Sequence, residues 1–243
     1  MGAALVGKEI VAIETPHPRH SLGRWQERLS GRAVRAVDAR GKHLFVRFEG
    51  DLTLHSHLRM GGRWSVYRLG ERWRRSARRA WLVIRTPEHE VVQFDGPVLE
   101  LMTDSRTRFD PWLAGLGPDL LADDFDERAF LRRLREDDRG RPFGDALLDQ
   151  RNVAGIGNIW RAEACFLARI DPRRRTGDVS DDEALAAVRA VRGPMRESAD
   201  GSRSSRWVHG RAGRPCRRCG TIVQAQRLGD ENRTVFWCPR CQS

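Results

Sequence analysis

Two closely spaced pairs of cysteines near the C-terminus are the residues whose chemistry is easiest to predict. Cys216 and Cys219 form one CxxC pair, Cys238 and Cys241 form the second, and eighteen residues separate the two pairs. Two such pairs place four thiolates around one metal ion, and sites of this spacing typically hold zinc. The sequence therefore predicts one structural Zn2+, which would take the place of an apolar core in so small a module.

The glycine-containing stretch "RNVAGIGNIW" is a candidate site for a phosphate group. Gly155 and Gly157 allow a sharp turn before a helix that we expect to begin at Asn158, and a helix N-terminus presents amide hydrogens to an anion. A dinucleotide-binding fingerprint would need a glycine where Trp160 stands, together with a preceding strand. We therefore expect a phosphate contact and exclude a dinucleotide cofactor.

A few further basic and apolar residues could contact a nucleic acid, although each has an ordinary alternative. Lys42 precedes a predicted strand, where it could bind phosphate, act in acid–base catalysis or be a plain surface lysine. Met60 follows Arg59 on a glycine-containing loop, where it could insert into a base stack or belong to the core. Arg233 lies between the cysteine pairs and could contact phosphate or stay solvated.

The net charge suggests an anionic partner. Lys and Arg total 44 against 33 for Asp and Glu, which gives a formal net charge of +11 over 243 residues. Lys8 and Lys42 are the only lysines, so nearly all of the positive charge is on arginine, which pairs with phosphate through parallel hydrogen bonds. This balance indicates a nucleic acid or another anionic surface, and an arginine-rich proteome is the alternative explanation.

Targeting signals are not evident. The sequence contains no apolar run of eighteen residues and no signal peptide at its N-terminus. The paired cysteines indicate a reducing compartment, and we expect the fifth cysteine, Cys165, to be a core residue on an apolar helix face. A cytoplasmic protein is the simplest interpretation.

The spacing of apolar residues divides the chain into a β-rich part and a helical part. Residues 1–105 contain alternating runs that predict strands at 8–14, 32–38, 42–48, 52–58, 80–86 and 90–95, with a hairpin turn at Gly50-Asp51. Such closely spaced strands suggest an antiparallel β-sandwich. Residues 111–200 have helical periodicity, with a capping box from Ser180 to Glu183 and a helix end at Gly193-Pro194.

The C-terminal region completes the predicted organisation. Residues 198–214 are small, polar and basic, and we interpret them as a mobile linker that orders on an anionic partner. Residues 206–243 form the cysteine module, whose intervening residues predict a β-hairpin. The predicted fold class is a multidomain α+β protein with an N-terminal antiparallel β-sandwich (1–105), a central helical domain (111–200) and a C-terminal zinc finger (206–243).

Three blocks taken together resemble the formamidopyrimidine-DNA glycosylase and endonuclease VIII family, most closely its endonuclease VIII branch. They are "RGKHLFVRFEGDLTLHSHLRMGGRW", "LLDQRNVAGIGNIWRAE" and "CRRCG…RTVFWCPRCQ", in this order and at this spacing. The resemblance spans nearly the whole chain and implies a β-sandwich, a helix-two-turn-helix domain and a zinc-finger hairpin. It also implies a monomeric, nucleoid-associated repair enzyme that acts on double-stranded DNA with damaged bases or abasic sites.

The resemblance implies a role for each candidate residue. Lys42 is similar to the sandwich lysine that contacts DNA and donates a proton during β-elimination, and Arg59 and Met60 are similar to the loop that fills the space left by a flipped base. Asn158, in the turn that contains Gly155, is similar to the asparagine that grips phosphates beside the lesion. Arg233 is similar to the zinc-finger arginine that holds phosphate and acts in δ-elimination.

The sequence departs from the family at its start. The family's Schiff-base nucleophile is an N-terminal proline followed by glutamate, whereas this chain opens Met1-Gly2-Ala3. Alignment of the later blocks implies a shortfall of roughly a dozen residues. Either the start of the gene is placed too late, which we favour, or the chain is a truncated member that binds damaged or abasic DNA without the usual chemistry. We expect no efficient covalent adduct of the chain as written with abasic DNA.

Overall fold

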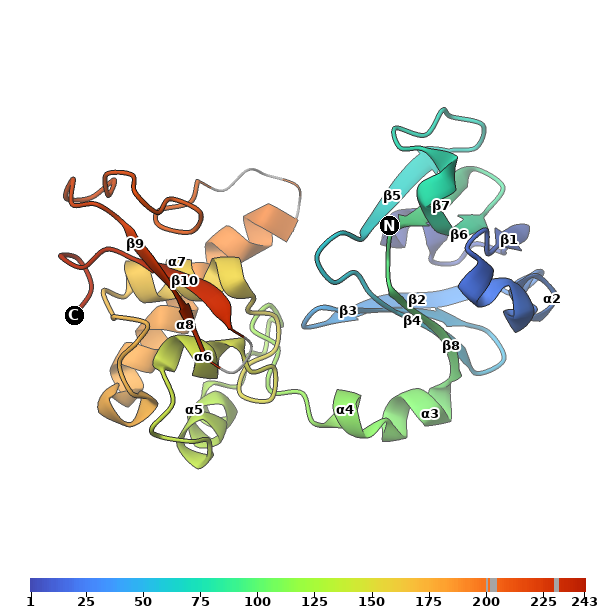
Figure 1. Cartoon of the computed structure of the whole chain (residues 1–243). Coiled ribbons are helices and arrows are strands. Elements are labelled where there is room, and N and C mark those ends of the chain that lie inside the picture. The colour runs from blue at the N-terminus through green and yellow to red at the C-terminus, as the bar shows by residue number, and fades with distance from the viewer. Residues whose placement is uncertain (200, 202–204, 230–231) are drawn as a thin grey trace. The chain divides into compact units, whose positions relative to one another are not determined.

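The computed structural model describes residues 1–199, 201, 205–229 and 232–243. The chain divides into two compact units, Met1–Ala114 and Gly115–Ser243. Figure 1 shows the strands of the first unit and the helices of the second. In the part of the chain that the structure describes, no helix is both long enough and apolar enough to cross a membrane.

The first unit contains two four-stranded antiparallel sheets, visible as separate layers in Figure 1. One sheet has the order β1-β6-β7-β5 and the other has the order β2-β3-β4-β8. The strands are β1 (Ala12–Glu14), β2 (Val34–Arg40), β3 (His43–Phe48), β4 (Leu52–His57), β5 (Arg63–Arg68), β6 (Ala80–Arg85), β7 (His89–Phe94) and β8 (Val98–Thr103). Apolar residues from both sheets, including Ile13, Phe48, Leu54 and Leu82, form one buried cluster. The predicted β-sandwich is therefore confirmed.

The hairpin between β3 and β4 forms where the sequence predicts it. A three-residue loop of Glu49, Gly50 and Asp51 joins the two strands. Gly50 and Asp51 have positive φ angles, 75° and 58°, which suits a tight hairpin loop. The register pairs Phe48 with Leu52 and His43 with His57. The turn therefore fixes which side chains of the two strands face one another.

Short helices complete the first unit. They are α1 (Gly2–Leu5), α2 (Trp25–Leu29), α3 (Asp104–Phe109) and α4 (Pro111–Ala114), together with the 3-10 turns η1 (Pro18–Gly23) and η2 (Ala77–Arg79). Leu5 and Leu29 are fully buried in the sandwich core. Helix α1 is thus packed against the same core as the strands.

The second unit is mainly helical. Its helices are α5 (Glu127–Glu136), α6 (Phe143–Leu148), α7 (Asn158–Leu167) and α8 (Asp181–Ala199), with the 3-10 turn η3 (Thr176–Asp178). Their apolar faces meet in a core that includes Phe130, Phe143, Val188 and the predicted core residue Cys165. Burial raises the pKa of the Cys165 thiol to about 12, so this cysteine is a packing residue.

The predicted end of helix α8 is wrong. The helix begins at the expected capping box. The Glu183 carboxylate accepts a hydrogen bond from the Ser180 backbone N–H, and the Glu183 backbone N–H donates to Ser180 Oγ. It then continues through Pro194 to Ala199. Arg192 donates to the carbonyl of Leu120, and Met195 packs into the core. These tertiary contacts on both sides offset the backbone hydrogen bond that proline cannot make.

The cysteine module folds onto helix α7. Its hairpin consists of β9 (Gln224–Leu228) and β10 (Arg233–Trp237), which pair in antiparallel register. Val208 and Val223 pack with Ala162 and Phe166 of α7 in one buried cluster. The helix therefore supplies the apolar surface that so small a hairpin cannot provide for itself.

The interpretation of 198–214 as a mobile linker is wrong for its C-terminal part. Residues 200 and 202–204 of this segment lie outside the described residues. The backbone N–H groups of Trp207, Val208 and His209 donate to the buried carboxylate of Glu163 at 2.8–3.1 Å. A carboxylate that accepts several backbone N–H bonds holds its segment firmly, so this stretch is anchored to α7 without any partner.

Candidate nucleic-acid interface and metal site

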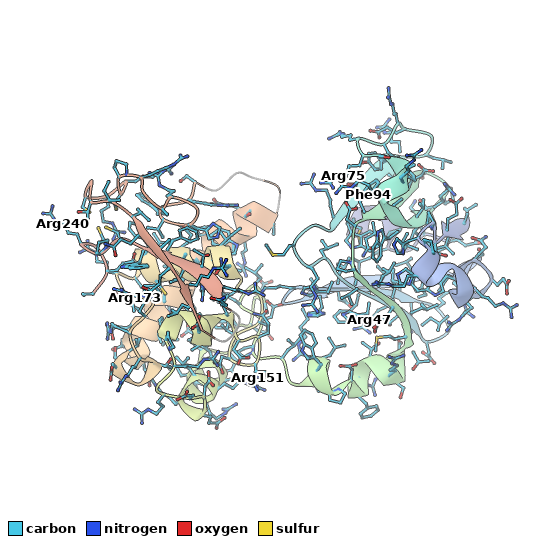
Figure 2. The ribbon with its side chains drawn as sticks, viewed as in Figure 1. Arg47, Arg75, Phe94, Arg151, Arg173 and Arg240 are labelled. Carbon is cyan, nitrogen blue, oxygen red and sulfur yellow. The ribbon has the colours of Figure 1, made fainter. Side chains whose placement is uncertain are left out.

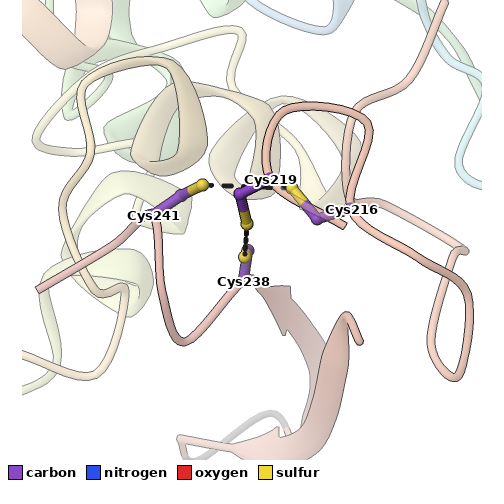
Figure 3. A group of neighbouring side chains, drawn as sticks. All are labelled: Cys216, Cys219, Cys238 and Cys241. Carbon is purple, nitrogen blue, oxygen red and sulfur yellow. Dashed lines mark hydrogen bonds between the residues drawn. The ribbon is translucent and has the colours of Figure 1, made fainter. Parts of the chain in front are cut away.

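The four cysteines of the two CxxC pairs converge at one point (Figure 3). Their Sγ atoms all lie within 4.8 Å of one another, with 4.0 Å between Cys216 and Cys241 and 3.5 Å between Cys219 and Cys238. In a tetrahedral sulfur site with metal–sulfur bonds of about 2.3 Å, the sulfur atoms are about 3.8 Å apart. The four side chains therefore fit one metal ion with little movement.

The four thiols differ in how readily they lose their protons. Hydrogen bonds from Thr221 lower the pKa of the Cys219 thiol to about 6. Burial and hydrogen bonds with the neighbouring thiols raise the pKa of Cys241 to about 12. Four sulfur atoms this close together can all be anionic only when a cation lies among them.

The side chain of Gln150 links two points of the turn before helix α7. Gly155 has a φ of 104° and donates its N–H to Gln150 Oε1 at 3.1 Å. The Gln150 amide donates in turn to the carbonyl of Ile156 at 2.9 Å. The α7 N-terminus at Asn158 therefore follows a rigid turn, as the glycine pattern predicts.

Asn158 connects this turn to the cysteine module. Its Nδ2 donates to the carbonyl of Thr234 on β10 at 3.1 Å. Its Oδ1 is buried and has no hydrogen-bond partner among the described atoms. The structure thus brings Asn158 and the start of β10, where Arg233 lies exposed, to the same place.

A buried ion pair, which the sequence analysis did not predict, supports this junction. Arg161, on the next turn of α7, is fully buried and donates to the Asp145 carboxylate and to the carbonyl of Arg233 at 3.2 Å. Burial lowers the pKa of the Arg161 guanidinium. The backbone of Gly229, just after β9, comes so close to this ion pair that a side chain there would collide with the Asp145 carboxylate.

In the first unit, Lys42 lies exposed in the turn between β2 and β3. Met60 lies in the loop between β4 and β5 and exposes 93% of its surface, so the alternative of a core residue is excluded. Arg59, beside it, has a positive φ of 51°. Its backbone N–H donates to His57 Nδ1 at 3.1 Å, and this contact fixes the start of the loop.

Three histidines between Lys42 and Arg59 were not predicted. His43 Nδ1 lies 2.7 Å from His55 Nε2, and the ring of His43 lies against that of His57. Burial, together with the charges of Lys42 and Arg59, lowers the pKa of His43 to about 3 and that of His57 to about 4. The sequence did contain a signal for this histidine cluster. The histidines of "KHL" and "HSHL" lie on two strands that are predicted to pair.

Comparisons with known proteins decide the family. Family models described as the N-terminal domain and the H2TH domain of formamidopyrimidine-DNA glycosylase match residues 1–109 and 116–207. A probable endonuclease 8 2 of Streptomyces coelicolor is 38% identical, over 99% of this chain and 88% of the relative. The chain belongs to the formamidopyrimidine-DNA glycosylase and endonuclease VIII family.

Other members show the same likeness. The DNA-(apurinic or apyrimidinic site) lyase Nei2 of Mycolicibacterium smegmatis is 38% identical over 99% of this chain and 93% of that protein. A formamidopyrimidine-DNA glycosylase of Lactococcus lactis, solved with DNA containing an abasic site, superimposes with a TM-score of 0.83 at 26% identity. That match covers 100% of this chain and 95% of the other. The resemblance seen in the three sequence blocks and the predicted fold class are therefore confirmed.

Proposed function

We propose that this protein is a base-excision repair enzyme, a DNA glycosylase and abasic-site lyase that acts on oxidised bases in double-stranded DNA. The observation that carries the proposal is the similarity, over 99% of the chain, to relatives named endonuclease 8 and abasic-site lyase. The net charge of +11 supports a DNA partner. We propose that it acts as a monomer on the DNA of the nucleoid.

The residues of the second unit are proposed to hold the phosphate backbone. The rigid turn at Gly155 leads to Asn158 at the first position of α7, where helix amides favour an anion. Arg233 begins β10, whose carbonyls accept hydrogen bonds from Asn158 and Arg161. One strand of the duplex would thus contact the α7 N-terminus and the hairpin together.

The loop with Arg59 and Met60 is proposed to occupy the space left by an extruded base. A base inside a duplex cannot be reached by a catalytic group, so the nucleotide turns out into a pocket. An apolar side chain that is 93% exposed costs free energy in water, and insertion between base steps would bury it. The exposure of Met60 therefore supports its role as the side chain that inserts between base steps. Arg59, the preceding residue, would contact the DNA beside it.

The proposed chemistry is Schiff-base catalysis. An amine attacks C1′ of the sugar, the bond to the damaged base breaks, and the base leaves with a proton. Loss of a C2′ proton then expels the 3′ phosphate, and a second elimination expels the 5′ phosphate. We assign Lys42 as a proton donor in β-elimination and Arg233 as a phosphate-binding group in δ-elimination. No residue of Met1–Ser243 is assigned as the amine.

The metal is proposed to be a single structural Zn2+ held by Cys216, Cys219, Cys238 and Cys241. All four ligands are sulfur atoms, which zinc accepts in closed tetrahedral sites, and their spacing suits its bond length. Such a site has no open position for substrate. We also propose the sequence-based division into a β-sandwich at 1–105, a helix-two-turn-helix domain at 111–200 and a zinc finger at 206–243.

Borohydride trapping on a duplex with one abasic site tests the catalytic proposal. Two proteins are compared: the 243-residue chain, and a form extended upstream by the in-frame codons for Met-Pro-Glu-Gly, if the gene contains them. We expect an efficient adduct from the extended form and little from the shorter one. Tight binding of abasic DNA without an adduct from either form would favour the alternative, a catalytically impaired binder of damaged DNA.

A further inference from the structure

A cavity of about 320 Å³ lies in the first unit beside strand β5. Its lining consists of Arg63, Ser65, Val66, Tyr67, Arg74 and Arg75. None of these residues has a part in the function proposed above. Three guanidinium groups around one small cavity make it a candidate site for an anion.

The cavity follows from how the chain leaves β5. Trp64 of β5 packs against the sandwich core. Because side chains alternate along a strand, the opposite face of β5 carries Arg63, Ser65 and Tyr67. The segment after β5 turns back over that face, where Trp73 packs with Tyr67 and Phe94. Trp73 is fixed further by donating its Nε1–H to Glu90 at 2.8 Å.

That anchor places two arginines over the strand. The backbone N–H of Arg74 donates to the Tyr67 hydroxyl oxygen at 3.3 Å, which leaves the hydroxyl proton to bind another acceptor. Arg75, labelled beside Phe94 in Figure 2, contacts Asp95 at 3.4 Å. The segment from Arg68 to Arg79 is therefore a folded arm over β5.

The positive charge of the cavity is largely uncompensated. Asp95 is shared, because it pairs with Arg79 at 2.6 Å as well as with Arg75. Within the described ranges, Arg63 and Arg74 form no ion pair with an acidic side chain. A cavity lined by the guanidiniums of Arg63 and Arg74 and by two hydroxyls attracts a monoanionic or dianionic oxyanion.

Its position favours a phosphate of bound DNA. Arg63 is three residues beyond Met60, and three residues span at most about 10 Å. One DNA strand advances about 3.4 Å along its axis per nucleotide. A duplex contacted by Met60 therefore brings phosphates to the cavity within about three nucleotides of that contact. A free nucleotide would need an open aromatic face, and Tyr67 is only 4% exposed.

We propose that the cavity lined by Arg63, Arg74 and Arg75 is a second DNA-contact site that binds one backbone phosphate on the flank of the lesion. This inference rests on the proposed DNA-binding function and extends the footprint along β5. It assigns a role to the arm at 68–79, which otherwise has none. The contact is independent of base sequence, because phosphates carry no sequence information.

The test combines a double variant with neutral phosphates. Binding is measured against salt for the wild type and for Arg63→Ala/Arg74→Ala, on a duplex with a tetrahydrofuran abasic analogue. We expect roughly tenfold weaker binding and a salt slope smaller by about 0.9, as for one lost phosphate contact. The matched control is Arg72→Ala/Arg78→Ala, which removes the same charge from the same arm outside the cavity lining and is expected to change binding far less.

A methylphosphonate scan locates the phosphate. In the wild type, one neutral linkage within about three nucleotides of the abasic analogue is expected to weaken binding roughly tenfold. In the double variant the same linkage should have no further effect. If the double variant does not fold, Arg74→Ala alone replaces it, since its exposed side chain makes no core contact.

Several outcomes overturn the proposal. Equal salt slopes for the wild type and the cavity variant would do so, as would a scan in which no linkage couples to Arg63 and Arg74. Saturable binding of inorganic phosphate lost in the variant, with DNA binding unchanged, would make the cavity a free-anion site. A different result would contradict the proposed repair function itself: the wild type would then bind abasic and intact duplexes with equal affinity.

Discussion

The buried guanidinium of Arg161 donates a hydrogen bond to the backbone carbonyl of Arg233, 3.2 Å away. A side chain proposed to hold DNA is thus positioned through its own backbone by a residue that has no access to solvent. The same guanidinium pairs with Asp145 of α6. The two helices and the hairpin therefore share one ion pair.

Replacement of Arg161 by methionine is expected to destabilise the protein by about 3–5 kcal/mol, because it leaves the Asp145 carboxylate buried without its partner. Urea unfolding followed by circular dichroism measures the change. The double variant Arg161→Met/Asp145→Leu should recover part of the loss, since no charge is then left unpaired. Strictly additive effects of the two substitutions would show that the pair is not coupled.

Acid should destabilise the sandwich through its histidines. Burial lowers the pKa of His43 to about 3 and of His57 to about 4, and it lowers the pKa of His55. The unfolded chain binds protons more readily, with a histidine pKa of about 6.5. The stability contributed by the neutral rings is therefore complete above about pH 6.5 and is lost as the pH falls toward 4.

Thermal melting between pH 8 and pH 4 checks this expectation. His43→Gln should lower Tm at pH 8, since a packed ring is lost, but flatten the decrease of Tm below pH 6. The exposed Arg72→Gln variant is a suitable control, with an unchanged pH profile. Parallel pH profiles for the wild type and His43→Gln would contradict the lowered pKa.

Truncation of Met60 should separate stability from DNA binding. Because the side chain is 93% exposed, Met60→Ala is expected to change the free energy of unfolding by less than about 0.5 kcal/mol. Binding to abasic DNA should weaken, and the fluorescence of 2-aminopurine opposite the lesion should change less on binding. Leu69→Ala, at another exposed apolar residue, is the control and should bind as the wild type does.

Removal of the metal should unfold the hairpin rather than the helices. Trp237 and Val235 are buried in the module, and without the ion the thiolates would repel one another. A chelator is expected to shift tryptophan emission to longer wavelength and to abolish tight DNA binding, while most helical circular dichroism remains. Cys165→Ser should keep one zinc per chain, and a lower zinc content would place Cys165 among the ligands.

Local signals in the sequence were enough for the elements that fold on local rules. Gly50-Asp51 specifies a hairpin turn, and Ser180 with Glu183 specifies a helix start, because each depends on neighbouring residues only. The CxxC spacing predicted the cysteine cluster for the same reason. These features could be predicted without knowing the rest of the fold.

Features that depend on distant partners could not be predicted. Pro194 reads as a helix end, yet packing around Arg192 and Met195 carries α8 past it. The segment at 207–209 reads as a linker, but its amides meet Glu163 more than forty positions earlier in the chain. Strand β5 was missed because its exposed arginines conceal the alternation. In each case tertiary contacts override the local preference.

Gly229 gives the zinc module an unusual kind of vulnerability. Its backbone takes a φ of 69°, and a methyl group there would meet the Asp145 carboxylate. A substitution at this position would leave every sulfur ligand in place, so the module would still load its ion and pass any assay of metal content. Arg233 would nevertheless be displaced from helix α7, where Arg161 holds its backbone carbonyl. A single methyl group at Gly229 would thus produce a separation-of-function allele. The protein would carry its full complement of metal, while Arg233 would no longer be positioned to bind a DNA phosphate.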